Sequence, residues 1–184
     1  MKNLDAFKEH GDVIWNIANL LRGPYRPPQY RRVMIPLTVL RRLDCVLEST
    51  KDQVIALHKK LKAEKKYDAE TIEKIINKKF KLTFHNTSKF SFETLLGDPD
   101  KLAANLGNYI AGFSSRARKI IEKFKFEEEI EKMEEANRLF EVVKQVAAVD
   151  LHPDTIPNIA MRNVSTTLRH LPWEFSVQPP LSAS

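Results

Sequence analysis

The sequence predicts a mainly α-helical protein, folded as a compact bundle of amphipathic helices. Apolar residues recur at a spacing of three and four positions over most of the chain, which is the period of a helix with one buried face. Apolar residues make up 42% of the 184 positions, enough for a substantial core. Helix start and stop signals such as Gly23-Pro24 and Asp98-Pro99 fall at the borders of the apolar stripes. Together they indicate several short helices.

The first two stripes predict helices over residues 13–21 and 30–47. Gly23-Pro24 ends the first, because glycine permits the left-handed conformation that commonly follows a helix. Pro36 lies inside the second, where it lacks a backbone donor and crowds the preceding turn. We therefore expect a kink or a late helix start near Pro36.

The next segment predicts two more helices and, after them, a short strand pair. A lysine-rich stripe covers residues 54–61, and Asp68 is placed to cap a helix that contains residues 72–80. Over residues 81–92, apolar and polar residues alternate on both sides of a polar stretch, a pattern compatible with one short β-hairpin.

The second half predicts three further helices. Asp98-Pro99 is a typical start for a helix that reaches to residue 113, and Ser114 or Ser115 is placed to cap the next one. The last apolar stripe predicts one helix over residues 130–146, with acidic residues favourably placed near its N-terminus. Beyond residues 150–153 the periodicity decays, and we expect an irregular C-terminal tail.

Positive charge is concentrated in the first part of the chain. Residues 1–81 hold 18 Lys/Arg and 10 Asp/Glu, a balance of +8, while the remainder holds 12 and 14, a balance of −2. A surface of this kind binds polyanions by releasing their counterions. Ordinary solvated helix faces would give the same composition, so both interpretations stay open.

Six arginines are candidate DNA contacts, because guanidinium groups bind phosphate in a bidentate way. They are Arg22, Arg26, Arg31, Arg32, Arg41 and Arg42. Structural roles compete for two of them: Arg41 lies three residues before Asp44, where a helix pair is expected, and Arg22 stands next to a helix end. Seven lysines provide weaker candidates or a solvated face: Lys59, Lys60, Lys62, Lys65, Lys66, Lys78 and Lys79.

The composition excludes several other classes. No apolar run approaches the roughly 20 residues of a membrane span. The first residues carry acidic groups instead of the basic start and apolar core of a signal peptide. Cys45 is the only cysteine and is expected to be a buried thiol, which fits a cytoplasmic protein. Neither a metal-binding spacing of histidines nor a catalytic constellation is evident.

Several segments in order resemble one known family. They include residues 14–23 (IWNIANLLRG), 36–44 (PLTVLRRLD), 84–88 (FHNTS) and 150–153 (DLHP). These resemble the N-terminal helical domain of the modification subunit of type I restriction–modification systems, an adenine-specific DNA methyltransferase. The resemblance covers about residues 12–160, and we expect residues 1–160 to form one N-terminal helical domain. Residues 161–184 match nothing expected there and form an atypical tail.

The resemblance implies a parent enzyme that transfers a methyl group from S-adenosylmethionine to adenine N6. That chemistry requires a glycine-rich turn that approaches the methyl donor and an Asn-Pro-Pro-Phe/Tyr motif that holds the flipped adenine. Neither motif occurs in this sequence. We therefore expect the catalytic domain to be absent from this truncated chain, which would bind no cofactor and would be inactive alone.

The family also implies partners. In it, two modification subunits join one specificity subunit on double-stranded DNA, and a restriction subunit can be added. The leading hypothesis is that this domain helps to clamp DNA and to assemble the complex. The alternative is a purely protein–protein helical module that never contacts DNA.

Overall fold

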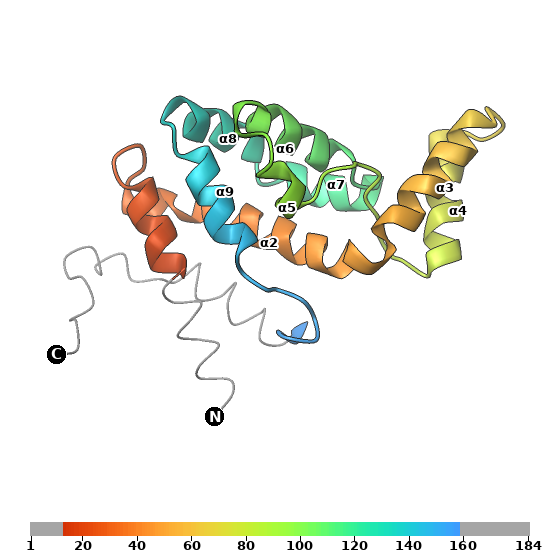
Figure 1. The fold of residues 1–184 in the computed structure, drawn as a ribbon, viewed down its shortest axis with the longest axis horizontal. Coiled ribbons are helices and arrows are strands. Elements are labelled where there is room, and N and C mark those ends of the chain that lie inside the picture. Colours follow the sequence, from red (N-terminus) through yellow and green to blue (C-terminus); the bar gives the residue numbers. More distant parts are fainter. Residues whose placement is uncertain (1–12, 159–184) are drawn as a thin grey trace.

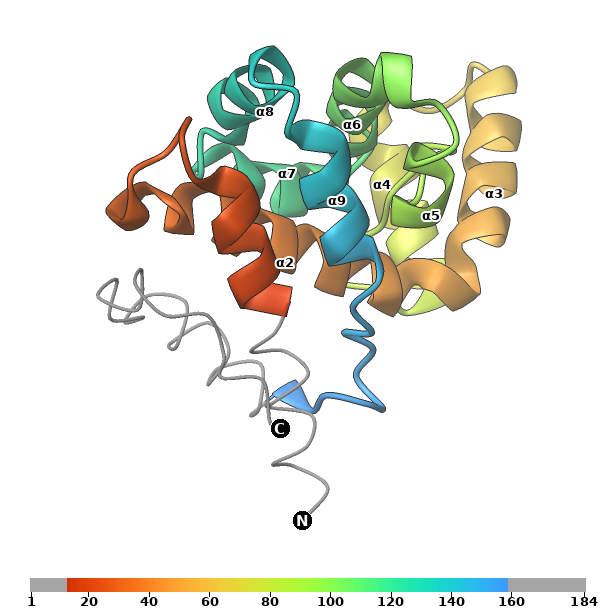
Figure 2. The same ribbon diagram turned by 60° about the vertical axis from the view of Figure 1, so that its left-hand side comes forward.

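The structure is a computed structural model that describes residues 13–158, and these residues are mainly helical (Figures 1 and 2). The described part contains no β-strand, only isolated bridges. The predicted mainly α class is confirmed. No helix within the described residues is both long and apolar enough to cross a membrane. The predicted tail after residue 160 lies outside the described part.

The long helix α2 (Arg31–Leu47) forms the floor of the bundle. A helical segment over residues 13–21 precedes it, followed by a turn and the short 3-10 helix η1 (Pro27–Gln29). Gly23 in that turn has φ +106°, a conformation that favours glycine and explains the predicted helix stop. Because α2 begins at Arg31, five residues before Pro36, the late start that we considered does not occur.

A helical hairpin projects from one end of the molecule (Figure 1). After η2 (Glu48–Thr50), it consists of α3 (Lys51–Ala63) and α4 (Ala69–Phe80), and we call residues 51–81 the arm. Its two helices bury a small cluster of their own: Val54, Leu61, Ile72 and Ile76. The predicted cap at Asp68 is confirmed, since its side chain accepts a hydrogen bond from the Thr71 N–H at 2.7 Å.

Residues 82–91 form a loop, and the hairpin considered for residues 81–92 is not formed. The apolar side chains of Leu82, Phe84 and Phe90 pack on the main core. The polar stretch bonds to the later helix α6 (Leu102–Ala111) and its end instead of to a second strand: the Thr87 N–H donates to the Gly112 carbonyl at 2.8 Å. An alternating pattern here marks a loop with one buried side.

The loop leads into α5 (Phe92–Leu95), η3 (Pro99–Lys101), α6 (Leu102–Ala111) and α7 (Ser115–Glu122). Asp98-Pro99 does open a helical turn, as predicted, and α6 follows it. Ser114 directly precedes α7, but its hydroxyl accepts from the His85 N–H at 3.2 Å instead of capping the helix. The cap comes from Glu73 of the arm, which accepts from the Ser115 N–H at 2.8 Å.

The prediction of a single last helix over residues 130–146 is wrong, because the structure has two helices there. α8 (Phe126–Glu135) ends at a turn in which Asn137 has φ +53°, and α9 (Leu139–Ala147) starts two residues later. Asparagine tolerates this left-handed conformation, and the Arg138 N–H closes the end of α8 on the Met133 carbonyl at 2.8 Å. Both helices pack against α2, so α2, α6, α8 and α9 enclose the main core.

Candidate nucleic-acid interface

The six predicted arginines divide into two groups along α2. Arg22, Arg26, Arg31 and Arg32 lie around η1 and the start of α2, and all four are exposed. Arg41 and Arg42 lie near the C-terminal end of α2 and are mostly covered. The predicted set is therefore not one continuous surface.

Arg42 is a structural residue. Its side chain is buried, with 9% exposure of the residue. One guanidinium nitrogen donates to the carbonyl oxygens of Leu151 at 2.5 Å and Ile156 at 2.7 Å, and the other donates to Asn158 Oδ1 at 2.8 Å. Burial lowers the pKa of this guanidinium. Its donors hold the segment after α9 and are not directed to solvent.

Arg41 acts on the same segment. Its Nε donates to the Val149 carbonyl at 2.9 Å, and its Nη1 lies 3.4 Å from Asp44 Oδ2. The helix pair that competed with a DNA role is therefore present. Cys45 is buried nearby against Leu151, as expected of a structural thiol.

The four exposed arginines make few hydrogen bonds and ion pairs with the rest of the described residues. Arg22 donates to Asn19 Oδ1 at 3.2 Å, a side-chain contact, and not to the helix-end carbonyls considered above. Arg32 lies 3.9 Å from Glu129 with its side chain 63% exposed, so this pair is weak. Arg31 makes no ion pair within residues 13–158. These arginines remain accessible to an anionic ligand.

A cluster of charged and polar groups lies between α2, α3 and α6, and only its pair Arg41–Asp44 was predictable from helix spacing. Asp44 Oδ2 accepts from the Phe92 N–H at 3.0 Å, and Asp44 Oδ1 accepts from the Tyr109 hydroxyl at 3.0 Å. Lys51 lies 4.0 Å from the same carboxylate and donates to the Phe90 carbonyl. Burial raises the pKa of Tyr109 and lowers that of Lys51. The cluster joins the arm to the bundle.

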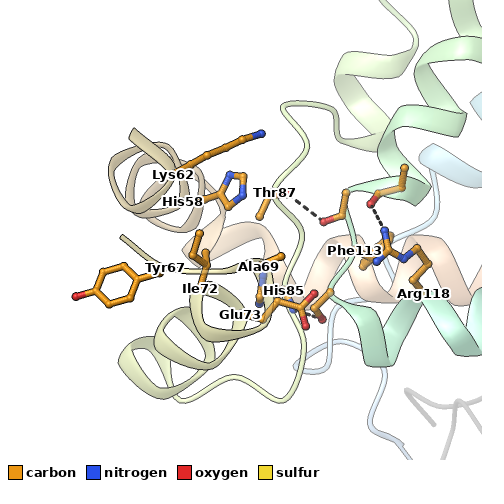
Figure 3. A pocket seen from close by; sticks show the side chains of 13 residues that line it. His58, Lys62, Tyr67, Ala69, Ile72, Glu73, His85, Thr87, Phe113 and Arg118 are labelled. Carbon is orange, nitrogen blue, oxygen red and sulfur yellow. Dashed lines mark hydrogen bonds between the residues drawn. The ribbon is translucent and has the colours of Figure 1, made fainter. Parts of the chain in front are cut away.

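A pocket of about 340 Å³ opens between the arm and the end of α6 (Figure 3). Lys62 of α3 and Arg118 of α7 stand on opposite sides of it. His58 and His85 also line it, and burial lowers the pKa of both, which favours uncharged imidazoles at neutral pH. Glu73 is engaged by the Ser115 N–H and hydroxyl, both at 2.8 Å. Among the described residues no group of three His, Cys, Asp or Glu is arranged to hold a metal.

One segment that carries the family resemblance, residues 84–88, packs on the end of α6. The loop FHNTS touches the end of α6: the Asn86 side chain donates to the Tyr109 carbonyl at 2.9 Å, and the Ser88 hydroxyl donates to Asn108 Oδ1 at 2.9 Å. The Ser114 N–H donates to the His85 carbonyl at 2.9 Å. These contacts are structural, so this part of the resemblance reports on the fold of the domain.

Comparison with known families agrees with the resemblance seen in the sequence. The family model described as the HsdM N-terminal domain matches residues 11–146, well over half of the chain. The matched range contains all six candidate arginines and the whole arm. No curated protein and no solved structure matches the chain.

Proposed function

Because the chain belongs to the HsdM N-terminal domain family, and so to the modification subunit of type I restriction–modification systems, we propose that it is a DNA-clamping and assembly domain. It contacts the backbone of double-stranded DNA and the neighbouring subunits, and it performs no chemistry alone. The observation that carries the proposal is the accessible arginine group around η1, within the matched family region.

The proposed contact set is smaller than the sequence suggested. Arg22, Arg26, Arg31 and Arg32 are exposed, and each guanidinium group can bind a phosphate through two parallel N–H groups. Arg41 and Arg42 are left out, because their donors are already bound to the segment after α9. Contacts of this kind position a protein on DNA without reading its sequence.

The partners follow from the family. A second modification subunit, the specificity subunit and the restriction subunit are proposed to surround this domain in a cytoplasmic complex. S-adenosylmethionine would supply the methyl group in a separate catalytic domain, since this sequence has neither the glycine-rich turn nor the Asn-Pro-Pro-Phe/Tyr motif. The role of this chain is to hold DNA and subunits in position.

Duplex binding across a salt series tests the proposal. A domain that neutralises phosphates loses affinity steeply as salt rises, with a slope of about −0.9 per phosphate contacted. Replacing Arg26, Arg31 and Arg32 by Gln should make that slope shallower, whereas Arg41→Gln should not. Absence of binding at low salt, or an affinity indifferent to salt, would contradict the proposal.

The alternative is a helical module that contacts only protein. Its support is that Arg41 and Arg42 serve the fold and Arg32 pairs with α8. Co-purification with the specificity subunit that survives all three Arg→Gln changes, without any shift of DNA mobility, is the result expected of this alternative.

A further inference from the structure

We propose that the arm, residues 51–81, is the main surface through which this domain contacts the DNA backbone, with its outward lysines bound to phosphates. The inference rests on the proposed DNA-clamping function and assigns it a surface. The exposed arginines Arg22, Arg26, Arg31 and Arg32 lie at the opposite end of α2, so the two surfaces can be tested separately.

Nearly all of the chain's net charge lies on the arm. Residues 51–81 contain ten lysines and five acidic residues, a balance of +5 within a chain total of +6. Nine of these lysines are exposed: Lys59, Lys60, Lys62, Lys65, Lys66, Lys74, Lys78, Lys79 and Lys81. Within the described residues, Lys74 alone among the nine forms an ion pair, with Glu70 at 2.6 Å. The positive charge is therefore available to a ligand.

The exposed lysines are not needed to hold the arm in place. The arm is closed by its own apolar cluster around Val54 and Ile76. It is attached to the bundle by half-buried Lys51, by Glu73, which accepts from the Ser115 N–H at the start of α7, and by Asn77, whose Oδ1 lies 2.7 Å from His85 Nδ1. Two exposed lysines lie over neighbouring rings, Lys66 over Tyr67 and Lys79 over Phe80, and remain exposed while doing so.

The chemistry of this surface fits a nucleic-acid backbone better than a protein partner. Protein–protein interface cores are depleted in lysine and enriched in aromatic side chains. Within residues 13–158, the exposed large hydrophobic residue is Ile120, which lies on α7. The arm therefore exposes no large hydrophobic side chain. A flexible ammonium group acts as a point charge that follows phosphates without fixed geometry. A surface of many such groups suits contact that is independent of sequence.

The position of the arm adds a geometric reason. It projects from one end of the bundle, beside the pocket that Lys62 and Arg118 flank (Figures 1 and 3). A projecting hairpin reaches a neighbouring rod-shaped duplex without requiring the bundle to change shape. The arm therefore offers many exposed lysines outside the packed core.

Two matched triple variants of the 184-residue chain test the inference. The arm variant carries Lys59→Gln, Lys60→Gln and Lys66→Gln, and the control carries Lys101→Gln, Lys123→Gln and Lys144→Gln, exposed lysines outside the arm. Both lose three charges. Binding to a labelled random-sequence duplex is measured from 25 to 300 mM salt, about the range in which counterion release dominates.

The arm variant should lose about tenfold or more in affinity at roughly 100 mM salt, and its log–log salt slope should be shallower by about two to three. The control should keep the wild-type slope. A third variant with Lys→Arg at the three arm positions should bind as wild type does, which shows that a loss in the Gln variant comes from charge. Circular dichroism of all variants should stay unchanged.

Three outcomes overturn the inference. Equal loss in the arm variant and the control indicates an effect of net charge alone. If the arm variant binds the duplex as the wild type does and the variant of Arg26, Arg31 and Arg32 loses affinity, the proposed function stands. The arm is then not the main DNA-contact surface. Loss of specificity-subunit binding without loss of DNA binding assigns the arm to a protein partner. No duplex binding by the wild-type chain rejects the proposed function itself.

Discussion

At the scale of single residues, the most consequential group is the carboxylate of Asp44. It accepts hydrogen bonds from a backbone N–H and a tyrosine hydroxyl and forms an ion pair with a lysine ammonium at 4.0 Å, in a side chain that is 9% exposed. The sequence predicted its pairing with Arg41 on the same helix. Its partners Phe92 and Tyr109 lie 48 and 65 positions away, beyond the reach of helix spacing.

Asp44→Ala should therefore lower the free energy of unfolding by about 3–5 kcal/mol, because it leaves a half-buried ammonium without its anionic partner and a buried N–H without its acceptor. Urea denaturation followed by circular dichroism measures this. Asp44→Asn keeps an acceptor and should cost less. Adding Lys51→Met to Asp44→Ala should recover part of the loss, and a double variant with no recovery would show that Lys51 does not depend on Asp44.

Arg42 gives a second prediction at this scale. Arg42→Lys removes the fork that reaches two carbonyl oxygens and Asn158 together, so residues 149–158 should exchange their amide hydrogens faster. Hydrogen–deuterium exchange mass spectrometry measures this change. Duplex affinity should stay as in the wild type, because this side chain is buried. A loss of affinity with unchanged exchange would assign Arg42 to DNA instead.

The histidines of the pocket predict a pH dependence. Burial lowers the pKa of His58 and His85 below the ordinary value of 6.5, so near and below that pH the unfolded chain binds more protons than the folded one. Stability should therefore fall as pH decreases from 7.5 to 5.5. Denaturation of the wild type and of His58→Gln at both pH values tests the sign. The variant should show the smaller decrease, and an equal decrease in both would contradict the assignment of His58.

At the scale of elements, the contact between the FHNTS loop and the end of α6 depends on Gly112. A Cβ there would lie 2.5 Å from Asn86 Oδ1 and 2.6 Å from Ser88 Cβ, so a side chain must displace the loop. Gly107 lies in the interior of α6, and a Cβ there would meet nothing within 4 Å.

These two glycines form a matched pair. Gly112→Ala should destabilise the fold by about 1–3 kcal/mol through overpacking, while Gly107→Ala should stabilise it by about 0.5–1 kcal/mol through helix propensity. Thermal or urea unfolding measures both. If the two variants shift stability in the same direction, the close contact between Gly112 and the loop that contains Asn86 and Ser88 would be contradicted.

The elements themselves were largely predictable, because helix periodicity and local caps such as Asp68 act over a few residues. The last helix was mispredicted because its apolar stripe continues through the turn at Asn137, where the backbone and not the side-chain pattern breaks the helix. The strand pair over residues 81–92 was mispredicted because its polar groups find partners on α6. Both errors come from contacts or conformations that spacing does not encode.

At the scale of the whole molecule, the sequence indicated a basic surface but not its location. The division of the arginines into exposed and buried groups depends on contacts such as that from Arg42 to Leu151, 109 positions apart. From the sequence, the lysines of the arm are only weak candidates for DNA contacts, because each lysine alone resembles an ordinary solvated residue. The fold brings these lysines together on one projecting hairpin. It also places buried Arg42 beside the segment after α9, to which Arg42 is hydrogen-bonded.

The length of α2 sets the spacing between the two proposed contact surfaces. Its 17 residues extend for about 25 Å, which equals roughly seven base pairs of B-form DNA at about 3.4 Å each. The helix thus works as a spacer with a fixed span. In a length series of oligonucleotides, affinity should rise sharply once the duplex exceeds about eight base pairs and can touch both ends of that span; a smooth rise across that length would mean that only one end is engaged.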